Sequence, residues 1–324
     1  MKYPMLNNWL LLSPRNQNEV LVHDCLYDED YIIENRIASY IRKLNGRRNP
    51  YSISTSLSKH EIMYLLIQLR EYNLIRTGRV SSTSIGSVYI TLWYIKSNSR
   101  LKAFARVWNN VLIILWLPVL LAGLVAFLRY LPIENTSFMW IGNIIGIVVG
   151  ILLHELGHAF AGIAYNAEVF ELGIMLKSFL PGAYVLMNEK KVSSRIKRIQ
   201  INAAGVESNA LFAGLSILIA CVIPFVGGIC ISAAITNILL FFINSSFIVG
   251  FDGFAILSEL LGMKNLVEDT RIIVFNSRIR EKLRLKGVQG YLMIVMSVIV
   301  QSLRITFPLI IGWDIMEVIS CFIK

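Results

Sequence analysis

Five stretches of this sequence are long enough and apolar enough to cross a lipid bilayer as helices. They cover about residues 110–130, 138–165, 206–226, 230–258 and 289–312. A helix needs about 20 apolar residues to cross the hydrocarbon core, and each stretch has that length. Of the 324 residues, 55% are hydrophobic and 16% are charged, which is too apolar for a soluble protein of this size. We therefore expect a mainly α, polytopic membrane protein with about five spans and a membrane domain over residues 106–324.

The net charge of +10 has two possible meanings, nucleic-acid binding or membrane topology. Lys and Arg are concentrated in residues 1–109, 167–200 and 259–288, whereas the connections near 131–137 and 224–229 contain none. Positively charged loops stay in the cytoplasm, and five spans place all three basic segments on that side. The pattern favours a multi-pass protein of the cell membrane with a cytoplasmic N-terminus. We expect the lipid bilayer as its partner and expect no nucleic-acid binding.

Three further sequence features bear on this outline. Residues 313–324 can form an outer interfacial segment or part of a sixth span, and Arg304 is expected to extend toward the outer surface. The four cysteines form no CxxC pair, so neither a disulfide framework nor a thiolate metal site is expected. Residues 1–13 hold one Lys, a short apolar patch and no small-residue cleavage site, so we expect no cleavable signal peptide.

The first hundred residues have the pattern of a small soluble α+β domain, which we assign to residues 1–105. Residues 18–23 and 88–95 are expected to form strands. Residues 31–44 have apolar residues at helical spacing, and a capping box begins a second helix over residues 58–72. This order fits any small α+β domain. The segments NRIASYIRKLNGRRNPYSI and IMYLLIQLREYNLIRTG resemble the winged-helix domains that bind leader peptides in ribosomal-peptide biosynthesis.

The segment His154-Glu155-Leu156-Gly157-His158 lies inside the second apolar stretch. Two histidines four residues apart share one face of a helix, so both imidazoles can bind one metal ion. The glutamate between them is the usual general base of such a site. A charged side chain at the centre of a membrane helix costs about 2.5–3.5 kcal/mol, so Glu155 at this position indicates a function.

A hydrolytic zinc site needs a third protein ligand and an open position for water. The other histidines precede the membrane domain, and Glu207 and Asp252 are the carboxylates inside the neighbouring core spans. His154 and His158 lie about 10–16 Å from the cytoplasmic end of span two. Asp252 lies about 9 Å from the cytoplasmic end of span four, which is a similar depth. Glu207 is expected at the cytoplasmic lip of span three, facing water. Asp252 is therefore the expected third ligand, although it could instead cap or kink its helix.

These residues resemble the site-2 proteases, a family of intramembrane zinc metalloproteases. Their signature pairs a membrane HExxH with a later Asn-to-Asp-Gly element, found here at residues 154–158 and 244–253. Between the two, the family carries a small-residue motif. NAAGVESNALFAG is similar to it, with Gly205 and Asn209 in the matching places. The resemblance covers about residues 138–258.

The resemblance implies which residues carry the chemistry. His154, His158 and Asp252 would bind one zinc ion per chain, and Glu155 would be the catalytic base. Asn244 could hold the substrate backbone or the developing oxyanion, because its amide offers two donors. An asparagine in lipid can equally serve helix packing.

The sequence departs from the family pattern at two places. Val206 stands where the family usually has proline, and Phe247 and Val249 occupy the Asn-to-Asp stretch, where it usually has another. The ligand assignment does not depend on these prolines, whereas the helix bend that directs Asp252 does.

Residues 168–188 hold two apolar, β-compatible runs around Pro181-Gly182, which is a turn dipeptide. They resemble the family's membrane-associated β-hairpin beside the active site. An exposed strand edge can hold an unwound substrate by main-chain hydrogen bonds. The alternative is a plain cytoplasmic loop.

The expected activity is that of a zinc metalloendopeptidase. One substrate class is the precursor of a small secreted peptide, recruited through residues 1–105, and the N-terminal resemblance favours it. Another is a membrane-tethered signalling regulator. A non-catalytic metal-binding transporter or sensor would be expected to show internal repeats and polar groups along a path, which the sequence lacks. An inactive relative would not need Glu155.

Overall fold

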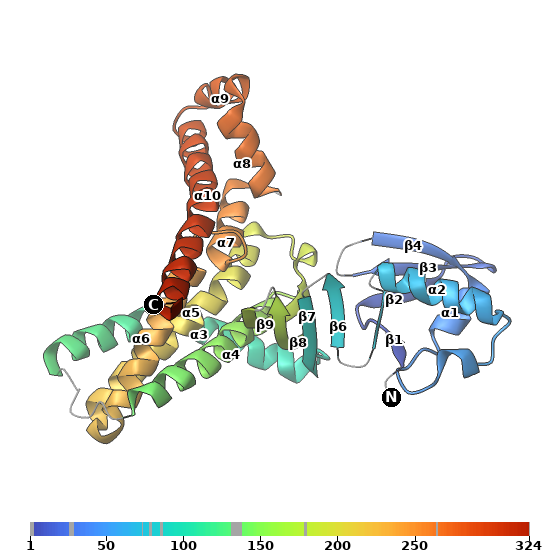
Figure 1. Cartoon of the computed structure of the whole chain (residues 1–324), viewed down its shortest axis with the longest axis horizontal. Helices are drawn as coiled ribbons and strands as arrows, with labels where there is room; N and C mark the ends of the chain where they lie inside the picture. The colour runs from blue at the N-terminus through green and yellow to red at the C-terminus, as the bar shows by residue number, and fades with distance from the viewer. Residues whose placement is uncertain are drawn as a thin grey trace. The chain divides into compact units, whose positions relative to one another are not determined.

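The computed structural model of the chain is mostly helical and contains small β-sheets (Figure 1). It describes residues 3–25, 29–72, 74–77, 80–84, 87–130, 138–177, 180–263 and 265–323. The predicted connection 131–137 lies outside this part of the chain. Two compact units are present. The first comprises Met1–Asn109 and His158–Ser193, and the second comprises Asn110–Gly157 and Ser194–Lys324.

The first unit begins with a three-stranded antiparallel sheet. Its strands are β2 (Leu10–Pro14), β3 (Glu19–Asp24) and β4 (Glu29–Glu34), with β3 in the middle. The helices that follow are α1 (Asn35–Ile41) and α2 (Lys59–Glu71). Sheet and helices share one hydrophobic core, whose buried members include Trp9, Leu10, Val22, Tyr40, Ile41, Leu44, Ile62 and Leu69.

Two sequence predictions for this region are confirmed. The strand over residues 18–23 is β3, and the helix over residues 58–72 is α2. The capping box is complete, because Ser58 Oγ accepts from the backbone N–H of Glu61 and the Glu61 carboxylate accepts from the backbone N–H of Ser58. These two bonds satisfy N–H groups that a helix start otherwise leaves without partners.

The predicted helix over residues 31–44 is wrong in its first part. Residues 31–34 belong to β4, and only Asn35–Ile41 are helical. The apolar positions fit a helical period, but Tyr31 and Ile33 pack toward the core while Ile32 between them is 53% exposed. This period of two is that of a strand, and pairing with β3 decides between the alternatives.

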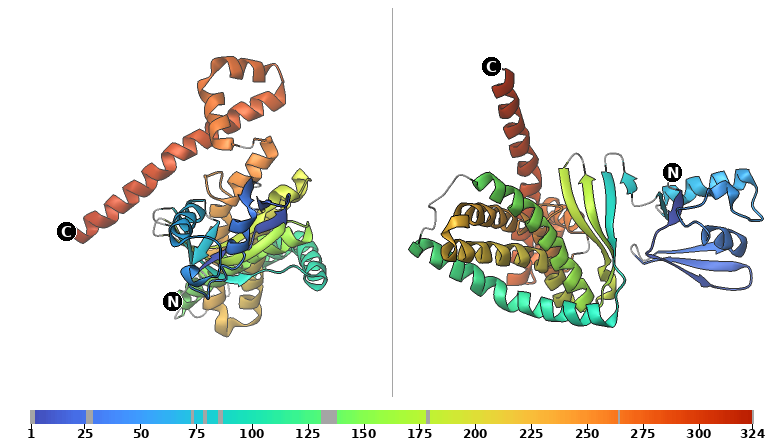
Figure 2. Two further views of the ribbon diagram at one scale, coloured as in Figure 1. Left: turned by 90° about the vertical axis from the view of Figure 1, so that its right-hand side faces the viewer. Right: turned by 90° about the horizontal axis from the view of Figure 1, so that it is seen from below.

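A second sheet contains six strands, each antiparallel to its neighbours, and Figure 2 shows its long strands side by side. In sheet order the strands are β1 (Pro4–Leu6), β5 (Ile75–Thr77), β6 (Val80–Ser84), β7 (Ser87–Tyr94), β8 (Glu168–Lys177) and β9 (Leu180–Asn188). The strand predicted over residues 88–95 is β7. The two apolar runs of residues 168–188 form the hairpin β8–β9.

The position predicted for the hairpin turn is wrong. Pro181 and Gly182 lie within β9, opposite Leu176 and Met175 of β8. The strands end at Lys177 and begin again at Leu180, and the two residues between them are outside the described part of the chain. A proline in a strand is tolerated here because β9 is the last strand of the sheet.

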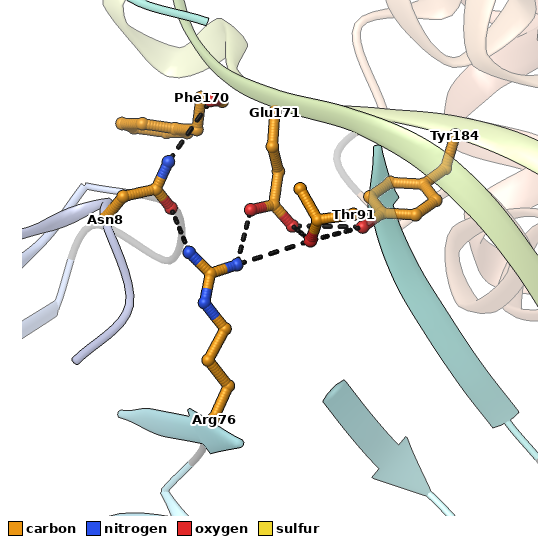
Figure 3. A network of polar contacts seen from close by, with 6 residues as sticks. All are labelled: Asn8, Arg76, Thr91, Phe170, Glu171 and Tyr184. Carbon is orange, nitrogen blue, oxygen red and sulfur yellow. Dashed lines mark hydrogen bonds and ion pairs between the residues drawn. The ribbon is translucent and has the colours of Figure 1, made fainter. Parts of the chain in front are cut away.

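A buried ion pair joins β5 to the hairpin (Figure 3). Arg76 Nη1 lies 2.5 Å from Glu171 Oε2, and the two side chains are only 1% and 2% exposed. The Glu171 carboxylate also accepts from the hydroxyls of Thr91 (3.2 Å) and Tyr184 (3.0 Å), on β7 and β9. Asn8 Oδ1 accepts from Arg76 Nη2. Four strands therefore meet at one charge pair, two from residues 75–94 and two from residues 168–188.

Among the residues that the structure describes, five helices are long and apolar enough to cross a membrane: Ser99–Arg129, Met139–Ala164, Arg195–Val222, Pro224–Asn244 and Val288–Thr306. They correspond in order to the five predicted stretches and support the expectation of a multi-pass membrane protein. The last belongs to α10 (Val288–Ile323), which continues as one helix past residue 313. The C-terminal piece is therefore an extension of the fifth helix, with no turn that would begin a sixth.

In the second unit, a row of glycines brings two of these helices close together. On α4 (Met139–Ala164), Gly142, Gly146 and Gly150 follow one another at intervals of four residues. A Cβ atom on any of them would overlap α6 (Gly227–Asn244). Small residues at this spacing allow the close helix contact on which packing in lipid depends.

The predicted fourth span over residues 230–258 is not one helix. It is divided into α6, which ends at Asn244, and α7 (Asp252–Leu261). Gly250 in the connecting segment has a φ of +101°, a conformation that residues with a Cβ rarely adopt. The chain thus changes direction at a glycine, whereas the family pattern usually has a proline in this stretch.

Candidate metal centre

Helix α4 presents both histidines of the HExxH segment. His154 and His158 are each 7% exposed and lie one helical turn apart. The boundary between the two compact units passes between Gly157 and His158, within this single helix. Helical geometry alone therefore keeps the two imidazoles on a common face.

Gly157 allows α5 (Arg195–Val222) to approach this part of α4. A Cβ at residue 157 would overlap the carbonyl of Ala204 and the hydroxyl of Ser208. The next residue on α5, Asn209, is fully buried, and its amide Nδ2 lies 3.2 Å from His154 Nδ1. The small residue inside the HExxH segment thus permits the close approach of α5 beside the contact between Asn209 and His154.

Asp252 is the first residue of α7, and its position depends on the segment before it. A Cβ on Gly253 would overlap the carbonyl oxygens of Ser245 and Ser246, so the backbone returns closely on the end of α6. The predicted convergence of Asp252 with the histidines is found. The predicted depth of Asp252 assumed one continuous helix, which is not present, because α6 ends at Asn244.

The three predicted ligands come together. One ligand atom from each of His154, His158 and Asp252 lies within 4.8 Å of the others. His154 Nε2 is 3.0 Å from Asp252 Oδ2. In a tetrahedral zinc site with bonds of 2.0–2.1 Å, ligand atoms are separated by about 3.3 Å. The group could therefore hold a metal ion, and two imidazoles with one carboxylate are a donor set that zinc accepts.

The amide of Asn209 can orient His154 for metal binding. If Nε2 binds a metal, a neutral imidazole carries its proton on Nδ1 and needs an acceptor there. Asn209 places Nδ2 at this position, while its Oδ1 is buried and has no hydrogen-bond partner in the described structure. Turning the amide by 180° satisfies both groups, since Oδ1 then accepts from Nδ1–H. The sequence showed Asn209 only as part of a motif, without indicating this contact.

Two predicted catalytic residues lie outside the ligand group. Glu155 is on α4 beside His154 and is partly exposed, and α4 has no other Asp, Glu, Lys or Arg. Asn244 is the last residue of α6 and is also partly exposed. The carboxylate of Glu155 therefore neighbours a ligand in the chain and is not fully buried. Among the described residues, no contact places Asn244 in a particular role.

The prediction that span three begins near Glu207 is wrong. Helix α5 already begins at Arg195, so Glu207 lies about three turns inside it. Glu207 is 9% exposed, and its carboxylate accepts two bonds from Gln200 Nε2 at 2.9 and 3.1 Å. It does not belong to the metal-ligand group.

The early start of α5 has a tertiary cause. Arg198 binds the Glu259 carboxylate of α7 through two bonds of 2.9 Å, and Arg195 donates to the Leu260 carbonyl. We assigned these basic residues to a cytoplasmic loop because of their charge. Contacts with α7 instead hold them in the first turns of the helix.

Comparisons with protein-family models, curated proteins and solved structures gave no match.

Proposed function

We propose that this chain is an intramembrane zinc metalloprotease of the site-2 protease type. One observation carries the proposal: ligand atoms of His154, His158 and Asp252 gather within 4.8 Å of one another in a strongly apolar helical region. Buried polar groups are costly there unless they are used. Glu155, adjacent to one ligand, supplies the additional carboxylate that hydrolysis requires.

The chemistry follows from the residues. A zinc ion bound there would lower the pKa of a water molecule toward neutrality and polarise the scissile carbonyl. Glu155 accepts the proton of the attacking water and then gives it to the leaving amine. His154, His158 and Asp252 hold the site in place, and Asn209 fixes the ring of His154 through Nδ1.

Substrate binding uses the free edge of β9. A peptide bond inside a helix is shielded, so a transmembrane substrate must be extended before it can be cut. β9 is the terminal strand of its sheet in the described structure, and β8 begins at Glu168, shortly after α4 ends at Ala164. An extended segment can pair with such an edge through main-chain hydrogen bonds.

The proposed substrate is the precursor of a small secreted peptide. The first unit has three antiparallel strands followed by α1 and α2, an order compatible with a winged-helix peptide-recognition domain. Such a domain would recruit the leader of the precursor. Release of a membrane-tethered regulator is the alternative, and it would not need this domain to bind a leader.

The test compares two glutamates exchanged for glutamine in the full-length protein. Glu155→Gln should abolish cleavage of a reconstituted substrate while leaving one zinc per chain, measured by elemental analysis. Glu207→Gln changes a buried carboxylate that is not a proposed ligand or base, and should preserve both. The substrates are a candidate precursor, namely any short peptide found to be encoded by a neighbouring reading frame, and a model transmembrane peptide.

Each outcome has a clear meaning. Cleavage by Glu155→Gln at the wild-type rate would refute the assignment of the base. Active protein without stoichiometric metal would refute the metalloprotease proposal as a whole. If the protein cleaved the transmembrane peptide and did not bind the candidate precursor, the result would favour release of a membrane-tethered regulator.

A further inference from the structure

Positive charge is concentrated in the segment that connects α8 (Leu266–Phe275) to α10. Residues 271–286 contain six basic side chains and a single acidic one, Glu281. The basic residues are Arg271, Arg278, Arg280, Lys282, Arg284 and Lys286. Residues 271–275 are the last residues of α8, and the short helix α9 (Ser277–Arg284) holds four of the six basic residues.

Four of these cations have no ionic partner within the described part of the chain. Arg278, Lys282, Arg284 and Lys286 are exposed and form no ion pair with any residue that the structure describes. Arg280 differs, because it donates to carbonyls at the end of α8. The four exposed cations are therefore free to bind an anion from outside the chain.

Large apolar side chains stand beside these cations. Phe275, Leu285 and Val288 are 74%, 84% and 86% exposed. The opposite side of the segment is fixed, because Ile273 and Leu283 are buried in a core shared with α7 and α10. The segment is thus a supported surface that presents both positive charge and apolar groups, the combination found in helices that lie at a membrane interface.

The position of this surface in the chain places it at a membrane boundary. Val288 is the first residue of the fifth candidate span. The last turn of α9 lies directly on that span, since a Cβ on Gly290 would overlap the carbonyl of Leu283. Figure 1 shows α9 at the end of α10. If Val288–Thr306 crosses a membrane, the cations of α9 lie within a few residues of its end, where phospholipid headgroups would be found.

We propose that α9 and its flanking residues bind the headgroups of anionic phospholipids. Phosphate groups would pair with Arg278, Lys282, Arg284 and Lys286. Phe275, Leu285 and Val288 would enter the boundary between headgroups and acyl chains. The inference is independent of the proposed protease activity, because it uses no residue of the metal centre.

The experiment measures lipid binding by the full-length protein in uncharged detergent micelles. Phosphatidylglycerol or phosphatidylcholine is added, and bound lipid is counted by native mass spectrometry. The wild type should prefer phosphatidylglycerol. Arg278→Gln/Lys282→Gln/Lys286→Gln should weaken phosphatidylglycerol binding at least about tenfold and leave phosphatidylcholine binding unchanged, because each cation near an anionic surface contributes about fivefold.

The control removes the same charge from another exposed region. Arg47→Gln/Arg48→Gln/Arg70→Gln should retain the wild-type preference. If the first triple variant does not fold, Lys282→Glu alone should still reduce the preference. The proposal would be overturned if the wild type bound both lipids equally, or if the control variant lost phosphatidylglycerol binding to the same extent. It would also be overturned if inorganic phosphate displaced bound phosphatidylglycerol as readily as the free lipid does.

Discussion

Removing Glu171 while Arg76 remains should strongly destabilise the first compact unit. The carboxylate is 2% exposed and accepts from Arg76, Thr91 and Tyr184. Glu171→Leu would leave a guanidinium buried without its counter-charge, which typically costs about 3–5 kcal/mol. A loss near 4 kcal/mol corresponds to roughly a thousandfold larger population of the opened sheet, since each 1.4 kcal/mol is tenfold.

The assay is hydrogen exchange of the full-length protein in detergent, followed by mass spectrometry of peptides from β5, β7 and β8. Arg76→Met/Glu171→Met removes both charges and should cost clearly less than Glu171→Leu, because a buried pair can often be replaced by apolar groups at little cost. Lys191→Met removes one partner of the half-exposed pair with Glu168 and should cost at most about 1 kcal/mol.

A double variant as unstable as Glu171→Leu would show that burial of unpaired charge is not the cause. Unchanged exchange in β5, with faster exchange only in β8, would show that the ion pair does not couple the N-terminal strands to the hairpin. Either result would refute this account of the first unit.

Three further predictions concern single residues. Asn209→Leu should weaken zinc binding about 10–100-fold, whereas Asn209→Asp should retain it, because a carboxylate can accept the proton on His154 Nδ1; equal affinity of both variants, measured by competition with a chelator, would contradict this. Gly253→Ala should lower zinc affinity and thermal stability, because its Cβ would overlap the Ser245 carbonyl. An unchanged zinc affinity would show that the close approach of Gly253 to Ser245 does not position the Asp252 carboxylate. Burial raises the pKa of the Cys25 thiol from 9.0 to about 11. At pH 8 about one thiol in a thousand is then ionised, and alkylation should be correspondingly slow. The thiol of the unfolded protein ionises at lower pH than that of the folded protein. The contribution of Cys25 to the free energy of unfolding is therefore present below pH 9 and is lost as the pH rises to about 11. Fast alkylation of the folded protein would contradict the burial of Cys25.

Local patterns in the sequence were sufficient for the features that depend on neighbouring residues. The capping box at Ser58 and Glu61 forms as predicted, because its bonds join residues three apart. His154 and His158 share a face because four residues make about one helical turn. Each apolar stretch contains a helix long enough to cross a membrane, because apolar composition and length are local properties of the sequence, although the fourth helix already ends at Asn244.

The sequence alone misled where a distant segment decides the local structure. Tyr31 and Ile33 fit a helical period and still form a strand, because β3 pairs with them. Arg195 and Arg198 look like a basic loop, yet α7 binds them in a helix. No local pattern indicated that Arg76 would meet Glu171, which lies 95 residues later in the chain.

The candidate metal centre divides in the same way. The sequence by itself determined its chemistry, two imidazoles and a carboxylate in an apolar environment, because residue type and spacing fix which groups a helix face can offer. Only the tertiary structure decided how the third ligand arrives, through a break after Asn244 that starts a new helix at Asp252, and which amide contacts His154. Those outcomes depend on close backbone contacts at Gly157 and Gly253, and such contacts exist only after separate helices have packed.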